Sequence, residues 1–168
     1  MEHSQLDKYV KNYINGDDSA FDVIYQETKK TVYLSIYSLI RNQSIIEDLM
    51  QDTYMKAINS LNYYHLGTNF SAWISRIARN TTINFLKKKN REDIIDPLEN
   101  KIFDETIDEN SHLLDFALNL LDDDEKAIIT YRVILGYTFK EISEITSLPL
   151  GTVYWIYRKA ISTIKKEL

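Results

Sequence analysis

The sequence predicts an all-helical protein made of two small domains that are joined by an acidic linker. Its 168 residues include only 4 Gly and 2 Pro, which is too few turn-forming residues for a many-stranded sheet protein. Apolar residues recur at helical spacing on both sides of a central stretch that has no such period. We therefore expect helical domains over residues 1–90 and 112–168, with a linker over residues 91–111.

Composition excludes several classes of protein. There is no cysteine, so disulfides and thiolate metal sites are excluded and a reducing compartment is expected. The N-terminus has no basic run followed by an apolar stretch, and no apolar run approaches the roughly 18 residues of a membrane span. We expect a cytoplasmic protein without membrane insertion.

Charge is distributed unevenly along the chain. The net charge of −5 counts by itself against nucleic-acid binding, because DNA-binding domains are usually basic. However, residues 91–112 carry 2 basic and 8 acidic groups, whereas residues 1–90 carry 11 and 9 and residues 113–168 carry 7 and 8. The acidity is concentrated in the linker, which is either a solvated spacer or an acidic strand that occupies a basic groove on a partner.

Four helices are expected before the linker. The first covers about residues 5–14, and the second starts after Ser19. The third is expected to open with a capping box from Ser44 to Glu47 and to continue to about residue 61. The fourth covers about residues 70–90 and follows a polar and aromatic loop.

Four further helices are expected after the linker, with N-caps at Ser111, Asp122 and Thr138 and a last start near Pro149. The short helix after Thr138, a turn at residues 146–148 and the longer final helix have the helix-turn-helix pattern, whose second helix enters the major groove of DNA. A generic helical hairpin is the alternative. In the last helix Val153, Tyr157, Ala160 and Ile164 share the expected core face. The exposed remainder is expected to include Thr152, Trp155, Ile156 and Lys159, with Tyr154 and Arg158 at its flanks.

One face of the fourth helix carries the side chains that a DNA surface requires. Arg76, Asn80, Asn84 and Lys87 recur at helical spacing, so they line one face. Amides can pair with base edges and cations can neutralise phosphates. The preceding loop contains Tyr63, Tyr64 and His65, which are either platforms for an unstacked base or lids on the core.

The third helix has a polar face formed by Asp48, Gln51 and Asp52. We expect neither a catalytic acid pair nor a metal site there, because no histidine or further acid stands at ligand spacing from these residues. The face is therefore either solvated or a docking surface for a basic partner. We expect no metal, no cofactor, no small-molecule substrate and no enzymatic activity.

Three motifs, in their order along the chain, resemble the extracytoplasmic-function (ECF) class of bacterial RNA polymerase sigma factors. DLMQDTYMKA at residues 48–57 resembles the DLxQExFxxA helix of that class. FSAWISRIARN at residues 70–80, followed by NFLKKK at residues 84–89, is similar to its FxxWLxRIARN…DxLR helix. The segments GYTFKEISEI and LPLGTV, at residues 136–145 and 148–153, resemble GxSxxEIAxxLxIPxGTV. The resemblance covers about residues 18–90 and 112–168.

The resemblance implies a sigma factor whose partners are core RNA polymerase and promoter DNA, with an anti-sigma factor as a further candidate. Asp48, Gln51 and Asp52 would dock on polymerase. The −10 promoter element would be opened and bound by Tyr63, Tyr64, His65, Trp73, Arg76, Arg79, Asn80, Asn84 and Lys87. The −35 element would be recognised by Thr152, Tyr154, Trp155, Arg158 and Lys159. The acidic linker would pass through the polymerase channel.

One segment departs from the family pattern. The family places Lys/Arg-Ser-Arg after Gly-Thr-Val, whereas this chain has Tyr154, Trp155 and Ile156. These residues could contact thymine methyl groups or another protein, so the promoter sequence does not transfer. A stand-alone helix-turn-helix regulator and a polymerase-binding adaptor are the alternative functions.

Overall fold

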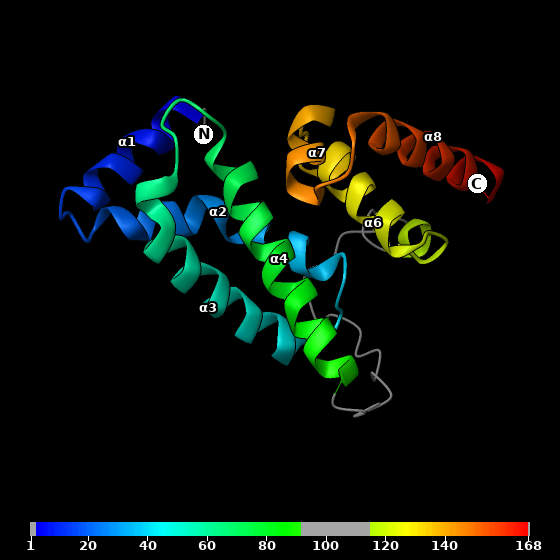
Figure 1. Ribbon diagram of the computed structural model, residues 1–168, viewed down its shortest axis with the longest axis horizontal. Coiled ribbons are helices and arrows are strands. Elements are labelled where there is room, and N and C mark those ends of the chain that lie inside the picture. The colour runs from blue at the N-terminus through cyan, green and yellow to red at the C-terminus, as the bar shows by residue number, and fades with distance from the viewer. Residues whose placement is uncertain (1–2, 92–114, 168) are drawn as a thin grey trace.

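The computed structural model describes residues 3–91 and 115–167, and all its regular elements over these ranges are helical (Figure 1). The expected all-helical class is thereby confirmed. Nearly all of the linker, and the expected N-cap Ser111, lie outside the described residues.

The N-terminal unit consists of four helices and a short 3₁₀ turn. These are α1 (His3–Ile14), α2 (Ala20–Tyr37), α3 (Gln43–Ser60), the turn at Leu61–Tyr63, and α4 (Phe70–Arg91). Helices α2 and α3 both pack against α4, and α1 packs against α2. Each expected helix is present to within a few residues at its ends.

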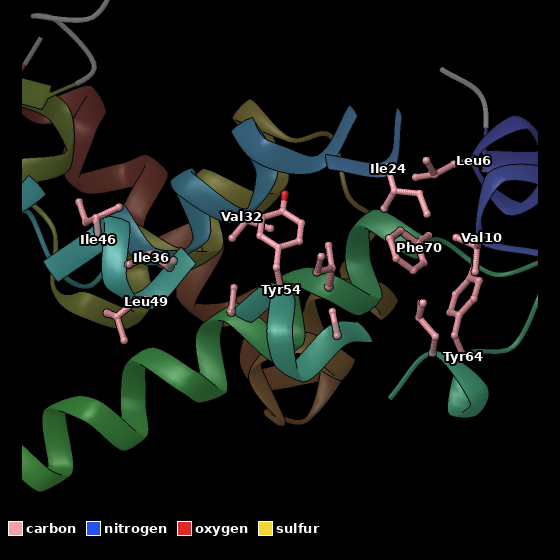
Figure 2. Packing of buried hydrophobic residues seen from close by; sticks show 14 of the residues in the cluster. Leu6, Val10, Ile24, Val32, Ile36, Ile46, Leu49, Tyr54, Tyr64 and Phe70 are labelled. Carbon is pink, nitrogen blue, oxygen red and sulfur yellow. The ribbon is translucent and has the colours of Figure 1, made fainter. Parts of the chain in front are cut away.

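A single apolar core holds the N-terminal unit together. Figure 2 shows labelled core side chains contributed by all four helices, with Leu6, Val10, Tyr64 and Phe70 gathered at one end. At its centre the Tyr54 hydroxyl lies 2.9 Å from the Thr28 hydroxyl, so the one polar group on this buried ring has a partner. The core fixes α4, and with it the direction in which the exposed face of α4 points.

The start of α3 differs from the expected capping box at Ser44. The N-cap is Asn42, whose side-chain oxygen accepts a hydrogen bond from the backbone N–H of Ile45 at 3.1 Å. Glu47 instead accepts a hydrogen bond from the Gln43 side chain at 3.0 Å. Asn42 and Ser44 are both of residue types that cap helices. The structure uses Asn42, so the helix begins two positions earlier than expected.

The C-terminal unit begins with a short helical stretch at residues 115–119. It continues with α6 (Asp123–Ile129), a π-helical segment (Thr130–Ile134), α7 (Phe139–Thr146) and α8 (Leu150–Glu167). The capping boxes expected at Asp122 and Thr138 are both present. Helices α7 and α8 flank a turn in which Ser147 has a left-handed backbone with φ of 58°. This is the expected helix-turn-helix.

The two units pack directly against each other. Helix α7 lies against α4, and Ala72 of α4 belongs to the same buried cluster as Tyr131, Tyr137 and Ile142 of the C-terminal unit (Figure 1). One side of the N-terminal half of α4 therefore packs against the C-terminal unit, whereas the C-terminal half of α4 extends beyond it.

Candidate nucleic-acid and polymerase interfaces

The polar face of α3 is exposed as a unit. Asp48, Gln51 and Asp52 are all exposed, while Ile46 and Leu49 on the other side of the helix are buried. Met55 follows one turn after Asp52 on the same face and is 60% exposed. An exposed methionine beside two carboxylates gives a protein partner both an ionic and an adaptable apolar contact. Met55 was not assigned to this face from the sequence, where only its polar neighbours were considered.

The exposed face of α4 carries the amide and cationic groups expected from its sequence. Arg76, Asn80, Asn84 and Lys87 are all exposed. On the buried side, Phe70, Ile74, Ala78 and Thr82 are at most 1% exposed and anchor the helix in the core. The exposed row therefore has a fixed direction, which suits a surface that must hold a nucleic-acid strand in register.

The aromatic loop before α4 is divided between exposed and buried rings. Tyr63 is 79% exposed and His65 is exposed, whereas Tyr64 is only 6% exposed. The Tyr64 ring packs edge-on against Phe70, with ring centroids 5.0 Å apart, and lies 5.4 Å from Trp73. Trp73 itself is partly buried against the core. In this arrangement Tyr63 and His65 are accessible to a base, and Tyr64 is not.

Arg79 is also inaccessible in this structure. It is 5% exposed, and its Nη2 atom lies 3.3 Å from Oδ1 of Asp124 at the start of α6. Its Nε and Nη1 atoms are buried without a hydrogen-bond partner among the described residues. A buried cation with a single anionic partner depends strongly on that partner. Arg79 therefore contacts the C-terminal unit, not solvent.

Further hydrogen bonds join the two units elsewhere along their contact. The Tyr137 hydroxyl lies 3.1 Å from the Ser75 hydroxyl, and both residues are buried. Burial raises the pKa of Tyr137 to about 12, and the hydrogen bond between its hydroxyl and Ser75 acts in the opposite direction. The Asn69 side chain donates to Glu141 Oε1 at 2.9 Å. One of these hydrogen bonds is buried and the other is partly buried, and paired polar groups of this kind indicate a specific contact between the two units.

A cleft of about 510 Å³ lies where the loop before α4 meets α7. Its walls include His65, Trp73 and Arg76 from the N-terminal unit and Lys140 and Glu144 from α7. Three of the residues assigned to DNA from the sequence, His65, Trp73 and Arg76, thus face the C-terminal unit across this cleft.

The five residues of α8 that were assigned to the −35 element from the sequence all lie on its exposed surface. Thr152, Tyr154, Trp155, Arg158 and Lys159 are all exposed, with Trp155 at 64% and Tyr154 at 47%. The expectation that Ile156 shares this face is wrong, because Ile156 is only 8% exposed and packs in the cluster with Ile142 and Val153. The core stripe of α8 is wider than its sequence suggests, since both α6 and α7 pack against it.

Aromatic and charged contacts hold the exposed side chains of α8. Tyr154 packs on Phe139 with ring centroids 4.2 Å apart, and the Arg132 guanidinium lies 4.6 Å from the centroid of the Phe139 ring. Lys159 pairs with Asp122 at 3.3 Å and with Glu125 at 2.8 Å. The pKa of Asp122 is lowered, mainly by the hydrogen bond it accepts from the backbone N–H of Glu125 and further by Lys159.

Within the described ranges, no group of three or more His, Asp or Glu residues is placed to hold a metal ion. None of the described helices is both long enough and apolar enough to cross a membrane. The candidate interfaces described above are therefore the exposed faces of α4 and α8, which suit nucleic acid, and the exposed face of α3, which suits a protein.

Comparison with known families assigns both units. Residues 24–92 match the family described as Sigma-70 region 2, and residues 111–162 match the family described as Sigma-70, region 4. The first match contains α3, the aromatic loop and α4, and the second contains the helix-turn-helix. Helix α1 lies outside both matches.

Individual relatives are similar over most of their length. The ECF RNA polymerase sigma factor SigW of Bacillus subtilis strain 168 is 24% identical over 97% of this chain and 96% of its own. The RNA polymerase sigma factor CarQ of Myxococcus xanthus is 27% identical over 84% and 85%.

Two solved structures share the fold. The sigma factor RpoE in complex with the anti-sigma factor NepR from Bartonella quintana aligns with a TM-score of 0.71 at 23% identity, covering 87% of this chain and 94% of that one. CnrH in complex with the cytosolic domain of CnrY aligns with a TM-score of 0.70 at 17% identity, covering 95% and 94%.

Proposed function

Because this chain belongs to the ECF class of sigma-70 factors and directs RNA polymerase to promoters, we propose a division of labour between its surfaces. The domain at residues 1–90 binds core polymerase through α3 and opens the −10 element through α4 and the loop before it. The domain at residues 112–168 recognises the −35 element through α8. The linker at residues 91–111 passes through the polymerase channel, where its acids stand in for nucleic acid.

The exposed row of Arg76, Asn80, Asn84 and Lys87 on α4 is the observation that carries this proposal. The row lies within the region 2 match and begins next to the loop that exposes Tyr63 and His65. Extruding a base from a duplex costs a few kcal/mol, so rings and amides held ready on one rigid helix favour the opened strand. Tyr64, which was assigned to this site from the sequence, is buried, and its role is to support the loop by packing on Phe70.

Recognising both promoter elements at once requires the two units to separate. The elements lie about 25 base pairs apart, which at about 3.4 Å per base pair is about 85 Å along the duplex. Helices α4 and α7 are in contact here, so α4 and α8 are only a few helix diameters apart. The described structure is therefore a closed form, and polymerase binding must draw the units apart.

An anti-sigma factor is a further proposed partner. The similar Bartonella structure is a complex with such a factor. On this chain, Leu150, Tyr154 and Trp155 expose apolar surface on α8 that either DNA or a protein inhibitor could cover. We assign no reaction to the chain itself, since the polymerase carries out the chemistry, and we place it inside the cell with the polymerase.

Transcription in vitro tests the function directly. The factor is combined with core polymerase and fragmented genomic DNA from its source organism, and transcript starts are mapped. We expect a small set of defined starts that share upstream sequences. If the folded factor binds core polymerase and no defined starts arise, the chain acts as an adaptor instead. If the factor binds specific DNA but has no affinity for core polymerase, it acts as a stand-alone helix-turn-helix regulator.

A further inference from the structure

Helix α1 reaches the −10 loop through one carboxylate. The backbone N–H of Gly67 donates to Asp7 Oδ2 at 2.6 Å, and the Tyr64 hydroxyl donates towards Asp7 Oδ1 at 2.7 Å. Asp7 thus binds two points of one loop, although it lies 57 and 60 residues away in the chain. The remainder of α1 is anchored by Leu6 and Val10, which are buried in the core.

The loop itself is a closed turn whose geometry these two bonds complete. The Tyr64 hydroxyl also lies 2.7 Å from the Thr68 carbonyl oxygen, and the Thr68 hydroxyl donates to the His65 carbonyl at 2.7 Å. Gly67 has φ of +89°, a conformation that L side chains rarely adopt. In this turn its N–H donates to the Asp7 carboxylate, and a hydrogen bond to a charged acceptor is the stronger kind.

The turn decides which side chains face outward. Buried Tyr64 is followed by exposed His65 and Leu66, and exposed Tyr63 precedes it. Because Tyr64 is held from below by Phe70 and at its hydroxyl by Asp7, the rings on either side of it project away from the core. Without the Asp7 bonds the loop gains conformations in which Tyr63 and His65 point elsewhere.

We infer that Asp7 is a positioning residue for promoter opening, which holds the loop at residues 64–68 so that Tyr63 and His65 can receive an extruded base. This inference rests on the proposed role of the loop at the −10 element. Helix α1 lies outside the region 2 match, so the loop is supported by a part of the chain that the family description does not cover. A charged hydrogen bond accounts for roughly tenfold in an equilibrium, which sets the expected effect of removing it.

The test separates opening of the promoter from binding of polymerase. Full-length factor and core polymerase are assembled on a promoter that the wild type opens, and opening is measured by permanganate reactivity of thymines at the −10 element. For Asp7→Ala we expect about tenfold less open complex, with affinity for core polymerase and closed-complex formation within twofold of wild type. Lys8→Ala, at an exposed position of the same helix, is the control and should open as the wild type does.

A conservative variant distinguishes positioning from general damage. In Asp7→Asn the amide oxygen can accept from Gly67, and the amide nitrogen can donate to the Tyr64 hydroxyl while that hydroxyl donates to Thr68. We expect this variant to restore most of the opening. On a template with a pre-melted −10 region the defect of Asp7→Ala should shrink, because the cost of base extrusion is already met.

Three outcomes would overturn the inference. The first is that Asp7→Ala opens the promoter as well as the wild type does. The second is that Asp7→Ala loses core binding and thermal stability to an extent that explains its opening defect. The third is that its defect is equally large on the pre-melted template and on the duplex template. A wild-type factor that opens no promoter at all would instead contradict the proposed function, so the two failures are distinguishable.

Discussion

The Arg79–Asp124 pair offers a direct way to loosen the closed form. In Asp124→Ala, Arg79 keeps its burial and loses its anionic partner. Breaking a fully buried pair costs about 3–5 kcal/mol, whereas an exposed pair contributes about 0–1 kcal/mol. The Arg79 side chain is 7% exposed and the Asp124 side chain is 55% exposed, so the pair lies between these limits. We expect the contact between the units to weaken by about 1.5 kcal/mol, which is about tenfold in the ratio of closed to open molecules.

Single-molecule energy transfer measures this ratio. The sequence has no cysteine, so one dye can be attached at Lys30→Cys on α2 and another at Lys166→Cys on α8. Asp123→Ala is the matched control, since Asp123 is the neighbouring acid on the same turn of α6 and, among the described residues, its ion pair is with Lys126 of its own unit, at 3.7 Å. We expect Asp124→Ala to populate an extended state about tenfold more than the control does.

Either of two results would refute this reasoning. If Asp124→Ala and Asp123→Ala give the same distribution, the pair does not hold the units together. If the wild type is already extended in the absence of polymerase, the closed form is not the free state of the factor. In the expected case, Asp124→Ala should also bind promoter DNA more tightly than the wild type when polymerase is absent, because α4 is less covered.

Three further changes have defined outcomes. Asp48→Arg combined with Asp52→Arg should weaken binding to core polymerase by tenfold or more in a pull-down titration, whereas the matched reversal at exposed Asp18 and Asp22 should not; equal effects would reject α3 as the docking face. Asp122→Ala removes an N-cap and should lower the free energy of unfolding by about 1 kcal/mol at pH 7 in urea. Because the folded-state pKa of Asp122 is lowered, this difference should be full above the ordinary carboxyl pKa and should disappear as the pH falls through the folded-state value; a difference that persists at pH 2 would argue against it. Ser147→Gly should raise stability by up to about 1 kcal/mol by relieving the left-handed backbone in the helix-turn-helix turn, and a lower melting temperature would contradict this.

The helices and most of their caps could be predicted because they depend on local pattern. The 3.6-residue period locates α4 and α8, and the spacing from Asp122 to Glu125 suffices for a cap whose two hydrogen bonds both form. Where two local patterns compete, as at Asn42 and Ser44, spacing alone does not decide between them.

The site was predicted less completely because exposure depends on distant parts of the chain. Arg76 and Arg79 lie one turn apart on α4 and have the same local signal, but only Arg79 meets Asp124, 45 residues further on. Ile156 is buried because two helices flank α8, and Asp7 matters because of a loop that is remote in sequence. A helical wheel gives the faces of a helix and does not show which neighbour covers each one.

The ion pairs of Lys159 change how α8 can gain affinity from DNA. A lysine that meets a phosphate usually displaces condensed counterions, and each such contact steepens the dependence of log affinity on log salt by about 0.9 units. Lys159 already has two carboxylates, Asp122 and Glu125, within 3.3 Å. On reaching a phosphate it would exchange these protein anions for a nucleic-acid anion and would leave Glu125, whose side chain is only 5% exposed, without its cation. Of the two cations assigned to the −35 element, Arg158 should then contribute more than Lys159 to the dependence of DNA affinity on ionic strength.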